Sequence, residues 1–147
     1  MTRGYTCIGL HRPRSSKNLG VVLRSGGSFA VDLIAVAGLR YGDSRRDVRK
    51  QYRHTPLLQV EDLRLALPYA CIGVAVDLIE DAAPLPEYCH PERAFYVFGP
   101  EDGTLDETLT AWCRDRVHVP TRRCLNLAAA VNIVLYDRLV KRGRAAG

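Results

Sequence analysis

Short apolar segments alternate with segments of helical spacing along this chain, and the alternation limits the folds open to it. Five runs have the composition of buried strands: residues 5–10, 31–37, 71–79, 93–98 and 117–119. Helices are expected over residues 18–25, 61–67, 106–114 and 125–141, with Asn18 capping the first and Gly26-Gly27 ending it. Such alternation favours a mostly parallel sheet covered on both faces by helices. We therefore predict one α/β domain over residues 1–147.

Composition supports one core and sets the compartment. The chain has 147 residues, of which 47% are hydrophobic and 25% charged, enough for one well-buried core. It contains no apolar run of membrane-spanning length, and its first residues lack the apolar segment of a signal peptide. Five cysteines, an odd number without a C-x-x-C pair, fit a reducing compartment. We expect a cytoplasmic protein that contacts no membrane.

A metal site is not expected either. Cys89-His90 has the residue types for half of one, but no second pair stands at ligand spacing. We therefore read Cys89 as a loop cysteine and His90 as a solvated histidine.

The net charge of +5 is concentrated in four basic clusters. They are Arg12, Arg14 and Lys17; the residues from Arg45 to His54; Arg122 and Arg123; and Arg138, Lys141, Arg142 and Arg144. Any one cluster is ordinarily a solvated face. Taken together they favour a polyanionic partner such as RNA.

The last expected helix is apolar nearly all round between Leu125 and Tyr136. A helix that ends a small domain ordinarily shows a polar face to water. Either the rest of the chain buries this helix on all sides or a second copy of the protein covers it, and we favour the second copy.

Three polar positions matter for function, although each alone has an ordinary explanation. Phe98-Gly-Pro-Glu-Asp-Gly103 is a glycine turn after a strand that presents Glu101. Asn126 reads as a helix cap, and Arg24 as a surface arginine. No G-x-G-x-x-G spacing follows a strand, so a dinucleotide site is not indicated.

Read as an ordered set, these segments are more specific. The blocks are N-x-G-x-x-x-R from Asn18, F-G-P-E-x-G from Phe98, and P-x(3)-C-L-N-L-x-x-A-x-x-x-x-L-Y from Pro120. The set closely resembles the signature motifs of the SpoU (TrmH-like) branch of the SPOUT RNA methyltransferase superfamily, most of all its small single-domain tRNA 2′-O-methyltransferases. The resemblance implies a C-terminal deep trefoil knot, S-adenosyl-L-methionine as cofactor, and a homodimer joined through the C-terminal helix.

The resemblance also assigns the site. It places Val76, Gly99, Val119, Cys124 and Leu125 around the cofactor, with Leu125 contributing its backbone amide. By the same likeness, Arg24, Asn18, Glu101 and Asn126 are the catalytic residues. Arg24 would hold the phosphate and stabilise the forming alkoxide, because a guanidinium is too basic to remove a proton. Asn18 and Glu101 would position Arg24 and the ribose, and Asn126 would brace the loops.

The implied activity is methylation of a ribose 2′-oxygen on RNA. The resemblance favours tRNA, with the wobble position as one candidate. Ribosomal RNA is the alternative substrate, and a knotted RNA-binding protein without catalysis is the alternative class. Two departures bear on this choice, since Cys124 and Ala128 stand where many relatives have serine, and the link from Val119 to Asn126 is shorter than in wobble-position members.

Overall fold

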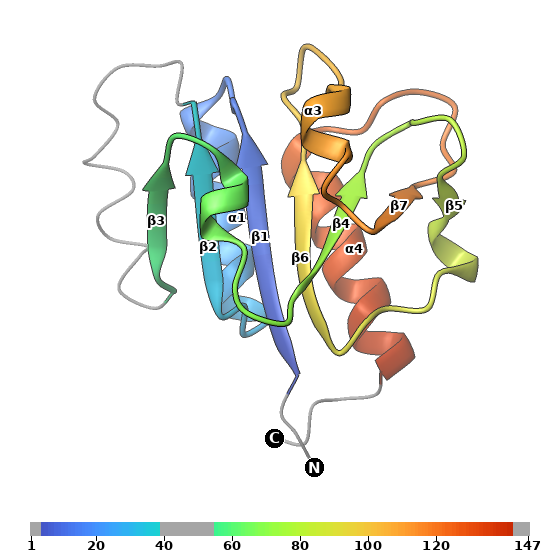
Figure 1. The fold of residues 1–147 in the computed structure, drawn as a ribbon, viewed down its shortest axis with the longest axis horizontal. Coiled ribbons are helices and arrows are strands. Elements are labelled where there is room, and N and C mark those ends of the chain that lie inside the picture. Colours follow the sequence, from blue (N-terminus) through green and yellow to red (C-terminus); the bar gives the residue numbers. More distant parts are fainter. Residues whose placement is uncertain (1–3, 39–54, 143–147) are drawn as a thin grey trace.

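Seven parallel strands form one sheet, in the order β3-β2-β1-β6-β4-β7-β5 (Figure 1). The structure is a computed structural model and describes residues 4–38 and 55–142, so the whole of the predicted basic cluster at residues 45–54 lies outside the described residues. The strands are β1 (Tyr5–His11), β2 (Leu33–Ala37), β3 (Leu57–Val60), β4 (Ile72–Val76), β5 (Ala83–Pro84), β6 (Arg93–Phe98) and β7 (Asp115–His118). The predicted α/β class with a parallel sheet is confirmed.

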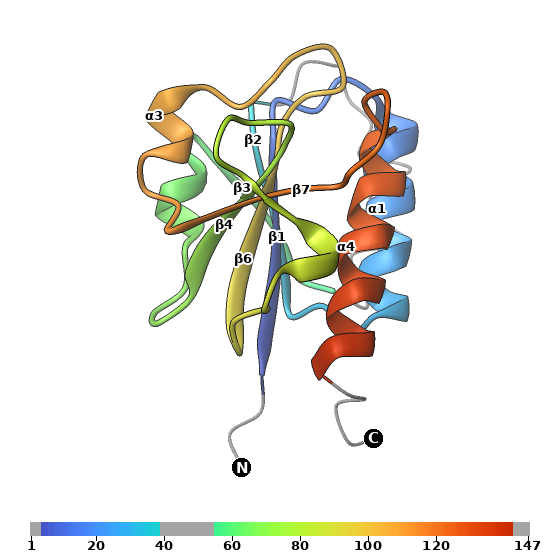
Figure 2. The ribbon, with the colours of Figure 1, turned by 90° about the vertical axis from the view of Figure 1, so that its right-hand side faces the viewer.

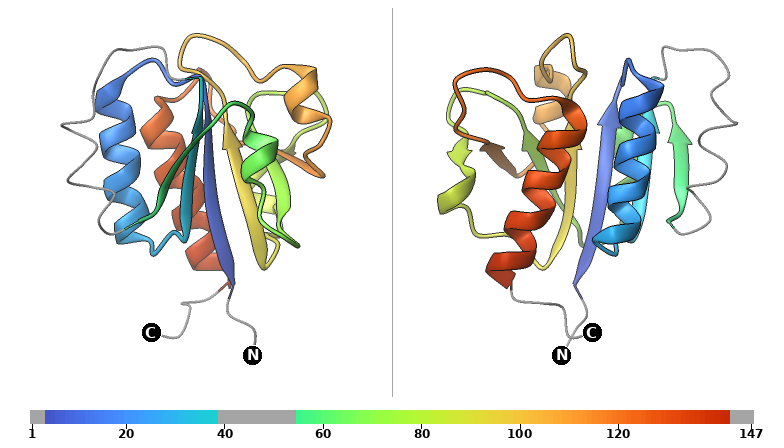
Figure 3. Two further views of the ribbon diagram at one scale, coloured as in Figure 1. Left: turned by 60° about the vertical axis from the view of Figure 1, so that its left-hand side comes forward. Right: turned by 180° about the vertical axis from the view of Figure 1, so that it is seen from behind.

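Helices cover both faces of the sheet, as predicted. α1 (Ser16–Ser28) and α4 (Leu127–Arg142) lie on one face, while η1 (Leu63–Ala66) and α3 (Glu107–Thr110) lie on the other (Figure 2). α1 and α4 run side by side, as the view from behind shows (Figure 3). A short turn of helix, η2 (Leu85–Glu87), packs against α4. The trefoil knot stays a prediction.

The core divides between the two faces according to the alternation of the strands. In β1 and β6, Ile8, Leu10, Tyr96 and Phe98 are fully or almost fully buried on the side of α1 and α4. Their neighbours in sequence face η1 and α3 in a second cluster that includes Phe95. Both sides of the central strands are therefore apolar, which is why these segments read as continuous hydrophobic runs.

The first helix differs from its prediction at both ends. Ser15, not Asn18, is the N-cap, and its Oγ accepts a hydrogen bond of 3.3 Å from the Asn18 amide. Gly26 and Gly27 lie inside the helix, which continues to Ser28. A Cβ added to Gly26 would lie 2.8 Å from Ile34 Cδ1, so this glycine lets the helix approach β2 closely. The glycine pair serves packing and not termination.

Two other predicted helices are shorter than expected. The segment 61–67 forms only the 3-10 turn η1, whose Asp62 side chain accepts from the Arg64 amide at 2.9 Å. The segment 106–114 forms the single turn α3, capped by Asp106.

All five cysteines are free thiols, and three of them are buried. Within residues 4–38 and 55–142, no cluster of three or more histidine, cysteine or acidic side chains is arranged to hold a metal ion. Over the same residues, no helix combines the length and hydrophobicity needed to cross a bilayer.

His90 is buried, which corrects the prediction of a solvated histidine. Its Nδ1 lies 2.7 Å from the Tyr96 hydroxyl and its Nε2 lies 2.6 Å from Asp137 Oδ2. Arg138 donates to the same hydroxyl at 3.0 Å, so Tyr96 is free to donate its own proton to Nδ1. With the neutral ring protonated on Nε2, Nε2 donates to Asp137 and Nδ1 accepts from the Tyr96 hydroxyl. A charged ring would carry a proton on Nδ1 as well, and Nδ1 could then no longer accept the Tyr96 proton.

This network predicts that acid destabilises the protein in the histidine range. Burial lowers the native pKa of His90 below its usual value of 6.5, although Asp137 opposes the shift. Below about pH 6.5 the unfolded chain takes up a proton that the native ring resists, so stability should fall by up to about 1.4 kcal/mol per pH unit. His11, whose pKa is also lowered by burial, adds in the same direction. Urea unfolding of wild type at pH 7.5 and pH 5.5 measures the total loss.

The variant His90→Gln should show a smaller loss between these two pH values, with the His11 part remaining. His118→Gln is the matched control, because the His118 ring is hydrogen-bonded to the Ala82 carbonyl at the edge of the sheet and takes no part in the network around His90. An unchanged pH dependence in His90→Gln would contradict the assignment.

Candidate functional site

A pocket opens at the carboxyl ends of three neighbouring strands, β6, β4 and β7. In an open parallel sheet, ligands bind at this edge because the loops that follow the strands meet there. The pocket holds about 640 Å³ of unfilled space, part of it open to solvent. Its lining includes all five residues predicted for the cofactor, namely Val76, Gly99, Val119, Cys124 and Leu125.

The wall of the pocket is mostly apolar, and Gly99 in it packs closely on the loop after β6. A Cβ on Gly99 would lie 3.2 Å from Leu105 Cδ2 and Cγ, tighter than ordinary contacts. A side chain at this position would require Leu105 to shift by a few tenths of an ångström, so glycine lets the loop after β6 pack closely on itself beside the pocket. Such a wall suits a flat apolar group whose polar edge meets main-chain groups.

Asp77 also lines the pocket and was missed by the sequence analysis. It follows β4 directly, and its Oδ2 accepts from the Leu105 amide at 2.8 Å while Oδ1 accepts from the Leu78 amide at 2.7 Å. The Asp77 amide in turn donates to the Val117 carbonyl at 3.0 Å. The signal that could have found it is a carboxylate immediately after a buried strand.

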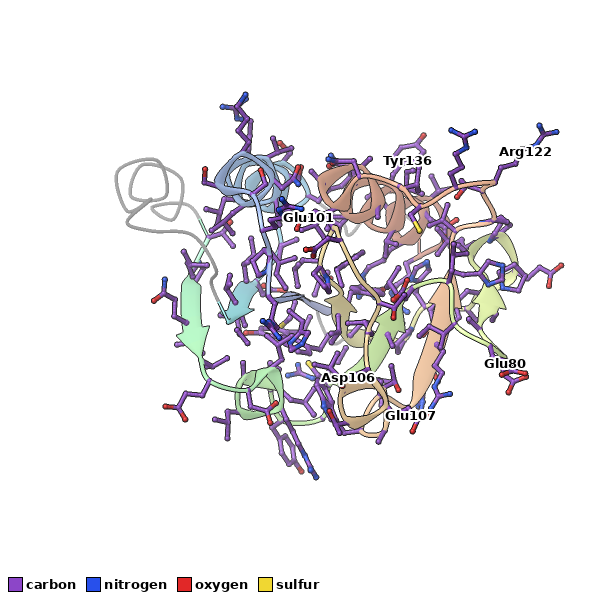
Figure 4. The ribbon with its side chains drawn as sticks, turned by 90° about the horizontal axis from the view of Figure 1, so that it is seen from above. Glu80, Glu101, Asp106, Glu107, Arg122 and Tyr136 are labelled. Carbon is purple, nitrogen blue, oxygen red and sulfur yellow. The ribbon has the colours of Figure 1, made fainter. Side chains whose placement is uncertain are left out.

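A chain of side-chain hydrogen bonds joins three of the four predicted catalytic residues near this pocket. Asn126 Nδ2 donates to Asn18 Oδ1 at 3.0 Å, and Asn18 Nδ2 donates to Glu101 Oε1 at 3.0 Å. The Arg14 amide donates to the other oxygen of Glu101 at 2.7 Å. Segments separated by 83 and 108 residues in sequence thus meet in one constellation, beside the ends of α1 and α4 (Figure 4).

Asn126 also caps α4, as predicted from its position. Its Oδ1 accepts from the amides of Ala128 at 2.9 Å and Ala129 at 3.2 Å. One side chain therefore fixes the start of α4 with its oxygen and binds Asn18 with its nitrogen.

Glu101 is held as a carboxylate by its donors. Partial burial would raise its pKa, but the hydrogen bonds from Asn18, from its own amide and from the amides of Arg14 and Ser15 outweigh burial. The net effect is a pKa below the usual 4.5, so the group is ionised at neutral pH. A permanent negative charge consequently stands on the wall of the pocket.

Of the four predicted catalytic residues, Glu101 lines the pocket, and Asn18 and Asn126 are joined to it by the hydrogen-bond chain. The fourth is Arg24. It is exposed on α1 and does not belong to the pocket lining. Six residues separate it from Asn18, which places the two about 120° apart around the helix. Arg24 shares its outward face of α1 with Lys17 and with Val21, which is 43% exposed.

The basic clusters have different fates. Arg122 and Arg123 are exposed on the loop that carries Cys124, and Arg122 extends outward from the molecule (Figure 4). At the other end of α4, by contrast, the described basic residues bind the chain itself. Arg138 donates to the carbonyls of Pro91 and Glu92, and Lys141 and Arg142 donate to carbonyls between Leu85 and His90. These three members of the fourth cluster fasten α4 to the segment before β6, and the remaining member, Arg144, lies outside the described residues.

The sequence matches a known family over most of its length. The model of the SpoU rRNA methylase family matches residues 5–136. No curated protein matches the sequence at a significant level.

Several solved structures have the same fold. AviRb, a SpoU methyltransferase from Streptomyces viridochromogenes solved with AdoMet, aligns with a TM-score of 0.80 at 19% identity, over 97% of this chain and 62% of AviRb. A protein studied for the 2-OH methylation of C/U34 on tRNA aligns with a TM-score of 0.79 at 22% identity, over 97% of this chain and 100% of that one. An AdoMet-bound rRNA methyltransferase from Sinorhizobium meliloti aligns with a TM-score of 0.81 at 21% identity, over 95% of this chain and 57% of that one. The chain therefore spans less than two thirds of AviRb, and these likenesses establish the fold.

The hydrogen-bond chain predicts energetic coupling between α1 and α4. In a double-mutant cycle, Asn18→Ala and Asn126→Ala should interact by about 0.5–1 kcal/mol, because each removes one partner of the same bond. Asn126→Ala alone should cost about 1 kcal/mol more than Asn18→Ala through the lost cap. Urea unfolding of wild type, the two single variants and the double variant measures the coupling energy and the cost of the lost cap.

The control cycle pairs Asn18→Ala with Asp106→Ala and should be additive, because Asp106 caps α3 on the opposite face of the sheet. Additivity in the first cycle as well would contradict the coupling.

Proposed function

The chain belongs to the SpoU rRNA methylase family, and we propose that it is an S-adenosyl-L-methionine-dependent RNA 2′-O-ribose methyltransferase. The observation that carries the proposal is the meeting of three distant segments at one pocket, with Asn18, Glu101 and Asn126 joined by hydrogen bonds beside it. A fold scaffold alone does not require this arrangement. A shared site for a methyl donor and an acceptor hydroxyl does.

The residues of the pocket fit the proposed cofactor. Val76, Val119 and Leu125 supply apolar contact for an adenine ring, and Gly99 leaves room for it. Main-chain groups of the three loops are available to its polar edge, including the amide of Leu125. S-adenosyl-L-methionine bound here would supply a methyl group attached to a sulfonium, from which the neutral thioether is a good leaving group.

The protein's contribution to the reaction is position and charge. The methyl carbon must lie in line between the sulfonium and the ribose 2′-oxygen, so alignment accounts for much of the rate. Glu101, held by Asn18 and the Arg14 amide, has a fixed orientation from which to hold the ribose. Arg24 would bind the adjoining phosphate and stabilise the forming alkoxide, because its guanidinium remains protonated and cannot act as a base.

A homodimer joined through α4 would bring Arg24 of one protomer to the pocket of the other protomer. The outward side of α4 carries Ile133, Tyr136, Leu139 and Val140, which are 39%, 60%, 38% and 61% exposed. An apolar groove along it runs to Phe29 at the end of α1. A second copy packed on this groove would also reach the face of α1 that holds Val21 and Arg24. We therefore propose that Arg24 acts at the site of the partner protomer.

Transfer RNA is the proposed substrate, and its wobble ribose is one candidate for the methylated position. Ribosomal RNA is the second candidate substrate. Arg122 and Arg123 on the loop beside the pocket, and Lys17 on the face of α1 that carries Arg24, supply positive charge where a polynucleotide would approach. A non-catalytic RNA-binding protein is the other class. The hydrogen-bond chain and the apolar pocket beside it favour the enzyme, because a protein that only binds RNA needs neither the chain nor the pocket.

Arg24→Ala should lower methyl transfer to unmodified tRNA by about 100-fold or more, because a charged donor at the forming alkoxide is lost. Cofactor affinity should stay unchanged, since Arg24 does not line the pocket. Arg24→Lys should remain strongly impaired if bidentate binding matters. Mass spectrometry of the digested nucleosides identifies the methylated ribose, and Arg64→Ala is the control, because Arg64 is an exposed arginine on η1, on the opposite face of the sheet (Figure 2). No mass gain on tRNA or ribosomal RNA with wild type would refute the enzymatic proposal.

Val140→Asp should weaken self-association at least about tenfold, because it places a charge in the apolar groove. Sedimentation velocity over a range of concentrations measures the change. Leu65→Asp is the matched control, as Leu65 is 73% exposed on η1, on the opposite face of the sheet. A wild-type protein that stays monomeric at high micromolar concentration would exclude the dimer.

A further inference from the structure

The pocket carries two carboxylates and no positive side chain among its lining residues, in a protein whose net charge is +5. Glu101 and Asp77 are the acidic pair. Arg122 and Arg123, which directly precede the lining residue Cys124, are exposed and are not part of the lining. The charge inside the pocket is therefore opposite in sign to that of the whole molecule.

Asp77 is held rigidly in this position. Backbone amides of Leu78 and Leu105 each donate to one of its oxygens, at 2.7 and 2.8 Å. These two bonds fix the rotamer and leave further lone pairs on both oxygens. Asp77 therefore ties the end of β4 to the loop after β6, and it also lies on the wall of the pocket.

Methyl transfer changes the charge of the ligand that the pocket would hold. The bond between sulfur and the methyl carbon breaks and its electron pair stays on sulfur, while a bond forms between the ribose 2′-oxygen and the methyl carbon. The hydroxyl proton leaves to solvent. A cationic sulfonium thus becomes a neutral thioether, and the attraction of nearby carboxylates is lost in the same step.

We propose that Asp77, with Glu101, makes the pocket select the cationic methyl donor over the neutral demethylated product. The inference rests on the proposed function and adds a specificity-determining residue to it. Asp77 attracts the sulfonium form, and the same pocket releases the product more readily once the charge is gone. Product inhibition is correspondingly weak.

Isothermal titration of the full chain with three ligands tests the idea. They are S-adenosyl-L-methionine, S-adenosylhomocysteine, and an analogue in which a protonated amine replaces the sulfonium. Wild type should bind both cationic ligands more tightly than S-adenosylhomocysteine. In Asp77→Asn, which keeps the side-chain volume, this preference should fall by about threefold to tenfold. Asp77→Glu should keep most of it.

The ratio of affinities separates charge selection from a structural role. If Asp77 only holds the loop through Leu105, Asp77→Asn should weaken all three ligands equally and leave the ratio unchanged. Asp106→Asn is the control, because Asp106 also accepts from backbone amides but stands on α3, away from the pocket (Figure 4). An unchanged ratio in Asp77→Asn, or equal affinities in wild type, overturns the inference alone. If wild type binds none of the three ligands, the proposed function fails and the inference with it.

Discussion

The hydrogen bonds from Asn126 to Asn18 and from Asn18 to Glu101 are the contacts on which the site depends. They join the starts of α1 and α4 to the loop after β6, three segments that share no local sequence. Parallel strands make this possible, because all their carboxyl ends lie at one edge of the sheet. The sheet brings the loops into range, and the amide and carboxylate groups then fix their relative positions.

The sequence predicted the elements that carry their own signal. β6 matches its predicted bounds because Ala94 to Phe98 is an uninterrupted apolar and aromatic run, preceded by Pro91 and followed by Gly99. The edge strand β3 was missed, since Leu57–Val60 is short, half-exposed and preceded by proline. Gly26 misled for a different reason, because its role depends on the tertiary approach of Ile34 and is invisible in a local pattern. The residues of the candidate site were predicted by resemblance, which supplied order and spacing that no single residue gave, and their roles stay predictions.

Polar residues that serve the interior were harder to recognise. His90 and Arg138 read as surface residues in the sequence, yet both are buried, and each finds its partners on segments more than 40 residues away or on Tyr96. A charged residue in a basic cluster can equally bind RNA or the carbonyls of its own chain. Only the fold distinguishes the two, since the partners of Arg138 are backbone atoms that carry no mark in the sequence.

The distribution of charge separates two tasks that oppose each other. A polyanion is attracted by positive charge on the outside, whereas a sulfonium is attracted by negative charge and would be repelled by the same arginines. Arg122 and Asp77 resolve this conflict by position, one exposed on the rim and the other on the wall of the pocket. Because water screens the outer charges more strongly than the inner ones, each field acts mainly on its own ligand. The loops after parallel strands suit this division, since each loop turns one side to solvent and the other to the sheet.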